Sequence, residues 1–384
     1  GGGGAQYIPT IHPADPDTVL VACDMTGSYL TQNGGQTWRQ INFKAWVKAF
    51  AFDPIKPSTI YAGSSGLYRS EDTGRTWKLI FPDPCSVIQE RTIGDHADHS
   101  FTSRDNWPGG RVEAICIVPE DSNQLFIGVN CGRLVVFRTA DRGKKWIECA
   151  QIDGSRFIKA CCSVTGTANH PEPFFLTDAG LFKLSLSDQT SKQILVPIQG
   201  DITDFSYGLD KSSREPIFYL TTVPALDAQN FTSGVLRSRN LGESWEPLEG
   251  GLDSDFTPGQ KRNFTRIATS PNNARIVYVS VVEPGDEGLE SGEEYFGIFK
   301  SEDMGTSWKW VLKIGKKNPP NRGLGWVEKD YPTTWGGAPF NLSVSPSNDQ
   351  VCYATDWGTT YRTIDGGKSW QQLYCEILPD ESVT

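Results

Sequence analysis

The stretch SEDTGRTW, from Ser70 to Trp77, is one of six copies of an eight-residue phrase that decides the fold. The phrase, hereafter the box, has the form Ser/Thr-x-Asp/Asn-x-Gly-x-Ser/Thr-Trp. Its chemistry suits a hairpin loop, because glycine supplies a positive φ angle, the Asp or Asn side chain caps the amides of the turn, and tryptophan anchors the loop in the core. The other copies are TQNGGQTW (31–38), TADRGKKW (139–146, with Lys145 replacing the hydroxyl), SRNLGESW (238–245), SEDMGTSW (301–308) and TIDGGKSW (363–370).

The intervals between boxes indicate a seven-fold repeat. The widest interval, between the third and fourth boxes, contains another strand-turn-strand pattern at 174–187 and a decayed box at 188–192. Restoring that unit gives seven units of about 55 residues, which account for the whole chain. Four-stranded units repeated radially are typical of a β-propeller. We therefore predict an all-β fold, a single seven-bladed β-propeller over residues 1–384 with four-stranded antiparallel blades; an open β-solenoid is the alternative.

Composition narrows the partners. The net charge is −10 and no basic run occurs, which disfavours nucleic acid, and no apolar segment is long enough to span a bilayer. The chain starts with Gly1 rather than Met, so we expect that a secretory signal or a leader has been removed, and that the protein is a secreted monomer, extracellular or periplasmic.

Cysteine usage gives no metal motif. Nine cysteines are an odd number, and no Cys-x-x-Cys spacing occurs. Cys352 and Cys375 flank the last unit and are candidates for a bridge, whereas Cys161 and Cys162 point to opposite sheet faces and are expected to be two buried thiols. We expect no required cofactor and no catalytic metal; a structural calcium ion is compatible with the sequence.

The longest insertion, residues 82–110, enters the third unit. It contains His96 and His99, two of the four histidines in the chain, together with Arg104. Long loops on a repeat scaffold carry binding and catalytic residues, so this insertion is a candidate site. The alternative is a solvated, charged loop that covers a sheet edge.

Cations gather where the inner strands are predicted to begin. Several cations converging on one axis favour an anionic ligand group such as a carboxylate or sulfate; alternatively, each extends separately into solvent. The loop before the last unit adds Arg322, Tyr331 and Trp335, and aromatic rings beside cations suit a sugar-binding cleft. The strand-mouth set is Trp46, Lys48, Arg111, Arg156, Lys159, Arg262 and Arg266.

Acidic residues mark three turns between second and third strands: Asp24, Asp178 and Asp356. Asp shortly before Gly is ordinary turn chemistry. Of the three, Asp24 is the best functional candidate.

The box resembles the Asp-box (BNR repeat) of sialidases, xyloglucanases and related sugar-active propellers, and the resemblance covers the whole chain. Residues 11–13 (IHP) and the pattern Asp24-x-x-Gly27-x-Tyr29 resemble the start of the first propeller of two-propeller xyloglucanases. In those enzymes the Asp of that turn serves as catalytic base, and the acid comes from a second propeller. The arginine triad of sialidases is missing. In architecture and pocket character the chain also resembles seven-bladed polysaccharide lyases, among them those that release rhamnose from glucuronate, which use a His, often with Tyr or Arg.

These resemblances imply a secreted carbohydrate-active enzyme. The expectation carried forward is an exo-acting polysaccharide lyase that performs β-elimination at a uronate of an anionic polysaccharide or oligosaccharide. The cations would neutralise the carboxylate, and His96 or His99 with Tyr331 would act as base and acid. The alternatives are a glycoside hydrolase with paired carboxylates including Asp24, and a non-catalytic propeller that binds glycan or protein. Fold alone does not choose among them.

Overall fold

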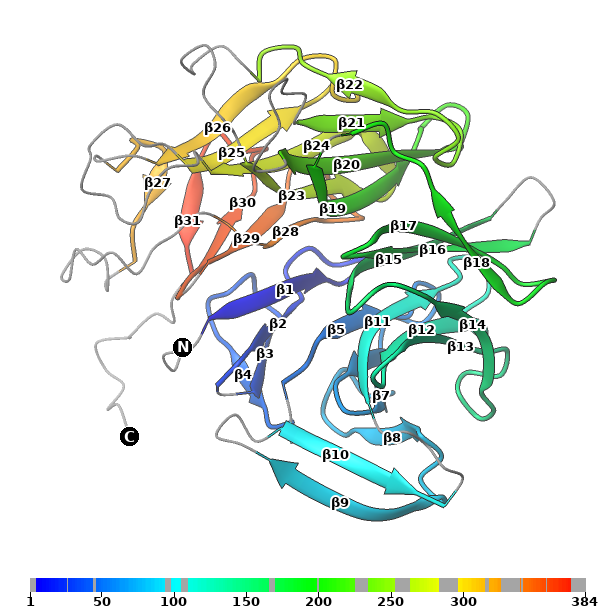
Figure 1. The fold of residues 1–384 in the computed structure, drawn as a ribbon. Coiled ribbons are helices and arrows are strands. Elements are labelled where there is room, and N and C mark those ends of the chain that lie inside the picture. Colours follow the sequence, from blue (N-terminus) through cyan, green and yellow to red (C-terminus); the bar gives the residue numbers. More distant parts are fainter. Residues whose placement is uncertain are drawn as a thin grey trace, which may run out of the picture.

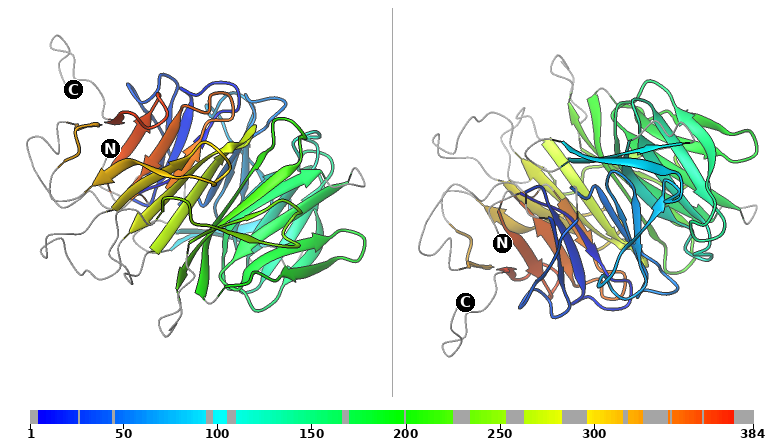
Figure 2. Two further views of the ribbon diagram at one scale, coloured as in Figure 1. Left: turned by 90° about the horizontal axis from the view of Figure 1, so that it is seen from above. Right: turned by 90° about the horizontal axis from the view of Figure 1, so that it is seen from below.

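Seven sheets of consecutive antiparallel strands surround a common axis (Figures 1 and 2). The computed structural model describes residues 5–25, 27–43, 46–93, 98–104, 110–165, 170–198, 200–224, 234–252, 263–282, 296–314, 318–325, 339, 341–356 and 358–373. Within these ranges every regular element is a β-strand. The prediction of an all-β, seven-bladed propeller with four-stranded blades is confirmed.

Each blade is four strands in sequence order, the first innermost. Blades 1 to 4 are β1 (Gln6–Ile11), β2 (Val19–Cys23), β3 (Gly27–Thr31), β4 (Arg39–Ile41); β5 (Ala49–Phe52), β6 (Ile60–Gly63), β7 (Leu67–Ser70), β8 (Lys78–Phe81); β11 (Arg111–Ile117), β12 (Leu125–Asn130), β13 (Leu134–Thr139), β14 (Ile147–Ile152); β15 (Ile158–Thr165), β16 (Pro171–Thr177), β17 (Gly180–Ser185), β18 (Thr190–Ile194). Blades 5 to 7 are β19 (Gly200–Leu209), β20 (Pro216–Pro224), β21 (Val235–Ser238), β22 (Glu246–Leu248); β23 (Asn263–Ser270), β24 (Asn273–Val282), β25 (Phe296–Ser301), β26 (Lys309–Ile314); β28 (Asn341–Val344), β29 (Cys352–Thr355), β30 (Thr360–Thr363), β31 (Trp370–Gln372).

Three further strands lie outside this scheme. β9 (Val87–Ile93) and β10 (Asp98–Ser103) form an antiparallel hairpin in the connection from blade 2 to blade 3, at the outer edge of the molecule (Figure 1). The short β27 (Arg322–Gly323) adds to the outer strand β31 of blade 7 in parallel. The sequence pattern did not indicate either addition.

The core is divided among the seams between blades. Each of the seven seams of the described chain has its own cluster of buried apolar side chains. At the closing seam, Ile11 and Val19 of blade 1 pack with Val351 and Tyr353 of blade 7. The first blade (blue) and the last (red) accordingly lie side by side (Figure 2), and packing rather than an exchanged strand joins them.

The box folds as its residue types predict. In the second copy, Asp72 Oδ1 accepts the amides of Arg75 and Thr76 at 3.0 and 2.9 Å, and Ser70 Oγ accepts the amide of Gly74 at 2.8 Å. Gly74 has a φ of 74°, and the indole of Trp77 donates to its carbonyl at 3.1 Å. The prediction of a capped, tryptophan-anchored hairpin is therefore confirmed in detail.

A basic side chain of one blade reaches the box of the next. The accepting group is always the carbonyl that follows the box Asp or Asn, and we call this contact the latch. Because blade 7 latches onto blade 1, the contact also closes the ring. The latches run from Arg39 to Thr73, Arg69 to Arg142, Arg237 to Met304, Lys300 to Gly366 and Arg362 to Gly34.

The cysteines are free thiols in the described part of the chain. Cys352 is a buried thiol in the blade 6–7 cluster, which does not support the expected bridge, and Cys375 lies outside the described residues. Cys162 belongs to the blade 4–5 cluster whereas Cys161 packs on the blade 3–4 cluster. The opposite orientation of these two neighbours is confirmed.

Candidate functional site

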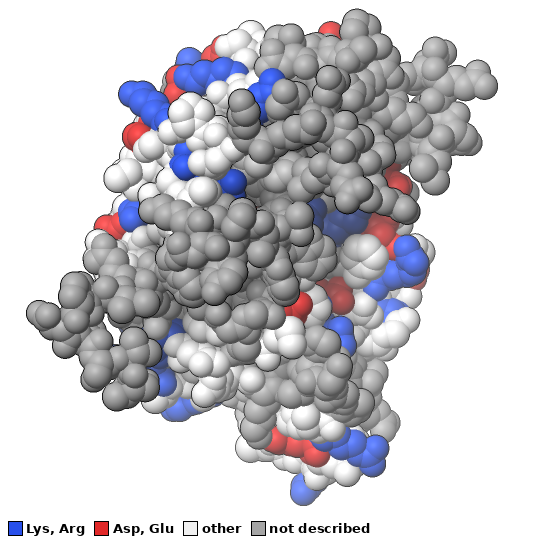
Figure 3. Space-filling model, turned by 90° about the vertical axis from the view of Figure 1, so that its left-hand side faces the viewer, with Lys and Arg blue, Asp and Glu red and all other residues white. Residues whose placement is uncertain are grey.

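The two ends of the propeller differ in what they present. Inner strands begin at one end, here called the entry face, and the turns between second and third strands lie there too, since Gln6 at the start of β1 pairs with Cys23 at the end of β2. The boxes lie at the opposite end, the box face. Figure 3 looks onto the entry face, and basic and acidic side chains lie next to one another over the part of it that is drawn in colour.

Asp24 lies on the entry face beside an aromatic pair. The rings of Tyr7 and Trp46 are 5.1 Å apart at an angle of 47°, and Lys48 Nζ lies 2.9 Å from the centre of the Trp46 ring. Burial, followed by the charge of Asp24, raises the pKa of Tyr7, as expected for a phenol near that carboxylate. This group, the Asp24 cluster, joins the inner edges of blades 1 and 2.

The Asp24 carboxylate is half-buried. Among the described residues its side chain accepts one long contact, 3.8 Å from Cys23 Sγ to Oδ1. Trp46 Nε1 is also buried without a hydrogen-bond partner in the described part of the chain. Buried polar groups are normally paired, so these atoms mark a place where a polar ligand can bind.

The equivalent acids in two other blades accept hydrogen bonds from backbone amides, Asp356 within its own turn and Asp178 from the segment before β15. Asp356 Oδ1 accepts the amides of Gly358 and Thr359 at 3.0 and 2.8 Å, and burial raises the pKa of Asp356. Asp178 accepts the amide and the Nε of Arg156 at 2.7 and 2.8 Å. Burial acts to raise the pKa of Asp178, but these hydrogen bonds outweigh it and the pKa is lowered. Both carboxylates are thus engaged by backbone amides, whereas the Asp24 side chain has one long contact among the described residues.

Two of the strand-mouth cations, Arg156 and Lys159, make contacts within the fold. Arg156 is paired with Asp178. Lys159 Nζ donates to the Ile202 carbonyl of the next blade at 2.6 Å, and burial is the main cause of its lowered pKa. Asp201 and Asp204 both act on Lys159, so the positive charge there is compensated.

Lys159 belongs to a series of links between inner strands. β11, β15 and β19 each have a register shift near their start, at the third, second and fourth residue respectively, and the side chain at the shift reaches the next blade. Glu113 accepts the Ile158 amide at 2.9 Å, and Thr203 donates to the Phe264 carbonyl at 2.6 Å. Lys159 therefore connects blade 4 to blade 5 through its hydrogen bond to the Ile202 carbonyl.

Asp204 and Arg266 complete the polar lining of blades 5 and 6. Asp204 accepts the Ile267 amide at 3.0 Å, and burial raises the pKa of its carboxyl group. Arg266 acts on both Lys159 and Asp204 and donates to the Thr265 carbonyl at 2.9 Å. The mouth is thus a mixed-charge surface, and the uniformly basic pocket expected from the sequence is not formed by the described residues.

His99 lies in the β9–β10 hairpin. Its ring is 8% exposed and packs edge-on against Phe101 at 4.8 Å, while Nε2 lies 3.4 Å from Glu90. Phe101 in turn borders Gly66, in the turn between the second and third strands of blade 2. His99 is therefore held against the outer part of blade 2, and the structure does not bring it together with Asp24.

The remaining predicted residues are scattered or outside the described ranges. Arg104 follows β10 and is exposed, as is Arg111 at the start of β11. Arg322 lies at the outer edge of blade 7, where it donates to the Tyr361 hydroxyl at 2.5 Å. Four predicted residues lie outside the described part of the chain: His96, Arg262, Tyr331 and Trp335.

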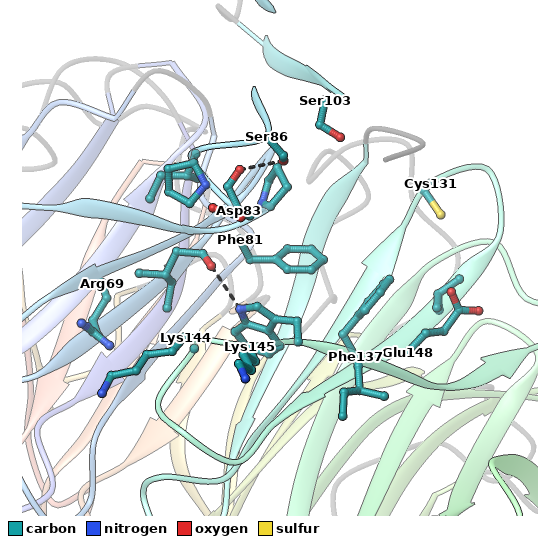
Figure 4. A pocket seen from close by; sticks show the side chains of 18 of the residues that line it. Arg69, Phe81, Asp83, Ser86, Ser103, Cys131, Phe137, Lys144, Lys145 and Glu148 are labelled. Atoms are coloured by element: carbon teal, nitrogen blue, oxygen red, sulfur yellow. Dashed lines mark hydrogen bonds between the residues drawn. The ribbon is translucent and has the colours of Figure 1, made fainter. Parts of the chain in front are cut away.

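A cavity of about 950 Å³ lies between the outer strands of blades 2 and 3 (Figure 4). Phe81 and Phe137 face each other in its wall at 4.9 Å, and Trp146 packs on Phe81 at 5.3 Å. Lys144 and Lys145 lie at one end, and Ser86 and Ser103 at the other. These rings pack against one another, and the lining of the cavity includes no residue of the Asp24 cluster.

Sequence reasoning missed Tyr7, Glu113 and Asp204. Tyr7 stands in an ordinary strand pattern, and the two acids lie on apolar inner strands. The available signal is a charged residue inside an otherwise apolar inner strand, because burying a charge is costly unless it is paired. In the described residues no group of three His, Cys, Asp or Glu is arranged to hold a metal ion, and no helix is long and apolar enough to cross a membrane.

Comparison with known proteins gives a consistent picture of the fold. A xyloglucanase of Acetivibrio thermocellus is 27% identical over 169 residues, which is 38% of this chain and 18% of that protein. A xyloglucanase of a Paenibacillus species is 20% identical over 97% of this chain and 37% of its own length. The crystal structure of an ancestral GH74 enzyme matches 99% of this chain and 47% of its own, with a TM-score of 0.67 and 18% identity. These likenesses show a shared fold. No protein-family model matches the chain.

The comparisons correct the expected chemistry. The relatives and the solved structure are xyloglucanases or GH74 enzymes, which are glycoside hydrolases, so the expectation of a uronate lyase is wrong and the hydrolase alternative is favoured. The contacts at the mouth agree with this correction, because Arg156 pairs with Asp178 and Lys159 donates to the Ile202 carbonyl near Asp201 and Asp204. The chain spans 18 to 37% of the length of these curated relatives.

Proposed function

We propose that this chain is the substrate-binding, base-supplying propeller of a secreted glycoside hydrolase that acts on a β-glucan such as xyloglucan. The observation that carries the proposal is the half-buried Asp24 carboxylate beside the Tyr7–Trp46 pair on the entry face. The curated xyloglucanase relatives support the choice of substrate class.

The aromatic pair suits a neutral sugar. A pyranose ring has an apolar face that stacks on an aromatic ring, while its hydroxyls take polar contacts at the edge. Trp46 contributes an aromatic ring that has Lys48 Nζ over one face, and its buried Nε1 has no partner among the described residues. Lys48 and Asp24 lie beside the pair as the polar groups that fix orientation. A mixed-charge mouth is also suited to a neutral glycan better than to a polyanion.

Asp24 is placed to act as a general base. A carboxylate that activates water on one face of the sugar inverts the anomeric centre, and the partner acid then stands about 6.5–9.5 Å away. In the described part of the entry face, the equivalent acids Asp178 and Asp356 already accept hydrogen bonds from backbone amides. We assign the acid to residues outside the described ranges or to another part of a longer protein.

The decisive experiment is the release of reducing ends from tamarind xyloglucan by wild-type protein and by Asp24→Asn. Removing a general base costs about 10²- to 10⁴-fold in rate. We expect a loss of that size with an unchanged melting temperature, and no ultraviolet absorbance of an unsaturated uronate from either protein. Asp188→Asn, at a turn on the box face, is the matched control and should retain full activity.

Binding is measured separately, so that a chain lacking its acid still tests the proposal. Titration with a xyloglucan oligosaccharide should give an affinity that Trp46→Ala weakens by about tenfold or more, given that stacking and hydrogen bonding are both lost, and that Asp24→Asn changes little. Undiminished hydrolysis by Asp24→Asn, or no binding of xyloglucan by the wild type, would contradict the proposal.

A further inference from the structure

Two seams of the ring, from blade 3 to blade 4 and from blade 4 to blade 5, have no latch among the described residues, and the first of them still has a basic residue in the latch position. The residue before the box hydroxyl is basic in blade 3, where it is Arg138, as it is in blades 2, 5, 6 and 7. Blade 4, toward which Arg138 extends, carries the decayed box. Its β17 and β18 are joined by a turn over residues 186–189, since Ser185 pairs with Thr190, and this turn is shorter than the box loops of the other blades. Gln189 keeps the positive φ of 55° that this position has in the boxes.

Among the described residues, Arg138 makes no hydrogen bond across its seam. Its Nη2 turns back to Gln124 Oε1 of its own blade at 2.7 Å. Its Nε is buried and has no hydrogen-bond partner among the described residues, which is also true of the Nε of the latched Arg362. In the other latches of this type the cation reaches a backbone carbonyl across the seam, as Arg69 does at 2.6 Å. A buried guanidinium nitrogen without an acceptor is costly, so an acceptor at this place would bind favourably.

A cavity of about 380 Å³ lies beside the short turn between β17 and β18. Arg138 and Lys145 line it together with the apolar side chains of Ile147 and Leu186. Lys145 is the residue that departs from the Ser/Thr of the box, so the two irregularities of the repeat meet in one cavity. Its volume lies within the range of about 300–1,000 Å³ that small-molecule sites have.

The other polar groups of the cavity do not oppose an anion strongly. Asp141 is directed into its own box, where Oδ1 accepts the amides of Lys144 and Lys145 at 2.9 Å each. Cys149 is a buried thiol that donates to the Val136 carbonyl, and burial raises its pKa to about 11, so it is neutral. Arg138 and Lys145 therefore outweigh the single acid.

We propose that this cavity, the blade 3–4 seam site, binds a small organic carboxylate with an apolar body. The carboxylate oxygens accept from Arg138 in place of a cross-seam carbonyl, with Lys145 as the second cation, and the body rests on Ile147 and Leu186. Charge-assisted hydrogen bonds to a guanidinium are the strong ones in proteins. The site lies on the box face and is independent of the Asp24 cluster.

Titration calorimetry at low salt with benzoate tests the proposal, with benzamide as the uncharged isostere. We expect benzoate to bind, benzamide to bind at least tenfold more weakly, and Arg138→Leu to weaken benzoate about 10- to 100-fold. Lys145→Thr, which restores the box consensus, should also weaken benzoate, whereas Lys144→Thr, one residue outside the cavity lining, should not. Arg138→Gln serves if the leucine variant does not fold. No benzoate binding by the wild type, equal binding of benzamide, or undiminished binding by the folded Arg138 variants would overturn the proposal.

Discussion

At the scale of the residue, the hydrogen bonds of the box turn lower the pKa of the Asp that caps it. Asp72 accepts hydrogen bonds from the Thr76 hydroxyl, the Thr76 amide and the Ser70 hydroxyl, and these hold its pKa far below the usual value. Asn33 occupies the same position in the first box and accepts the Thr37 amide at 3.0 Å. Asparagine can therefore cap the loop but cannot titrate.

Asp72→Asn should make the protein slightly less stable at neutral pH but less sensitive to acid. The folded-state pKa of Asp72 is depressed, so its contribution to stability is present above the unfolded pKa of about 3.9 and is lost as pH falls through the folded pKa. Melting temperatures of the two proteins from neutral pH to pH ~2.5 should therefore converge on acidification. A gap that widens toward low pH would contradict this account of the cap.

Asp24, Trp46 and Lys48 could be selected from the sequence because a turn after one strand and the start of the next inner strand meet on one face. What distinguishes Asp24 from Asp178 and Asp356 could not, since it depends on which neighbouring groups reach each carboxylate. His99 was chosen for its rarity in a long loop. The alternation of residues 98–103, which the structure shows as strand β10, was the overlooked signal.

At the scale of the element, the latch explains why a basic residue precedes most boxes. Arg362 donates to the Gly34 carbonyl at 3.1 Å and pairs with Asp17, and so connects the last blade to the first. Its counterpart Arg138 faces the decayed box and, among the described residues, makes no hydrogen bond across its seam. The two residues form a natural comparison.

Arg362→Leu should lower the free energy of unfolding by about 1–3 kcal/mol, because a partly buried charged hydrogen-bond network is lost. Arg138→Leu should cost less than about 1 kcal/mol, since the residue gives up one bond to Gln124 and no cross-seam contact. Urea denaturation followed by tryptophan fluorescence measures both. Equal losses in the two variants would mean that the latch does not contribute to ring closure.

The repeats of the sequence were sufficient to predict the blades, since each box fixes a hairpin and each hairpin its two flanking strands. The β9–β10 hairpin and β27 were not predicted. They are additions to single blades, so no repeat pattern reports them, and the pairing of β27 with β31 joins segments about 50 residues apart.

At the scale of the whole molecule, the propeller separates two surfaces with different chemistry. The entry face carries the Asp24 cluster, and the box face carries the latches and the blade 3–4 seam site. Seven separate seam cores hold these surfaces in place, so loops can vary without loss of the ring. The fold could be derived from the sequence, whereas the chemistry required the comparison with relatives, because many activities share one architecture.

The most direct test of the account is a crystal structure of the protein with a bound xyloglucan oligosaccharide. We expect a glucosyl unit stacked at Trp46, with an Asp24 carboxylate oxygen within about 3 Å of the sugar or of a water beside its anomeric carbon. Sugar bound on the box face, or on the entry face with Asp24 and Trp46 uncontacted, would contradict it.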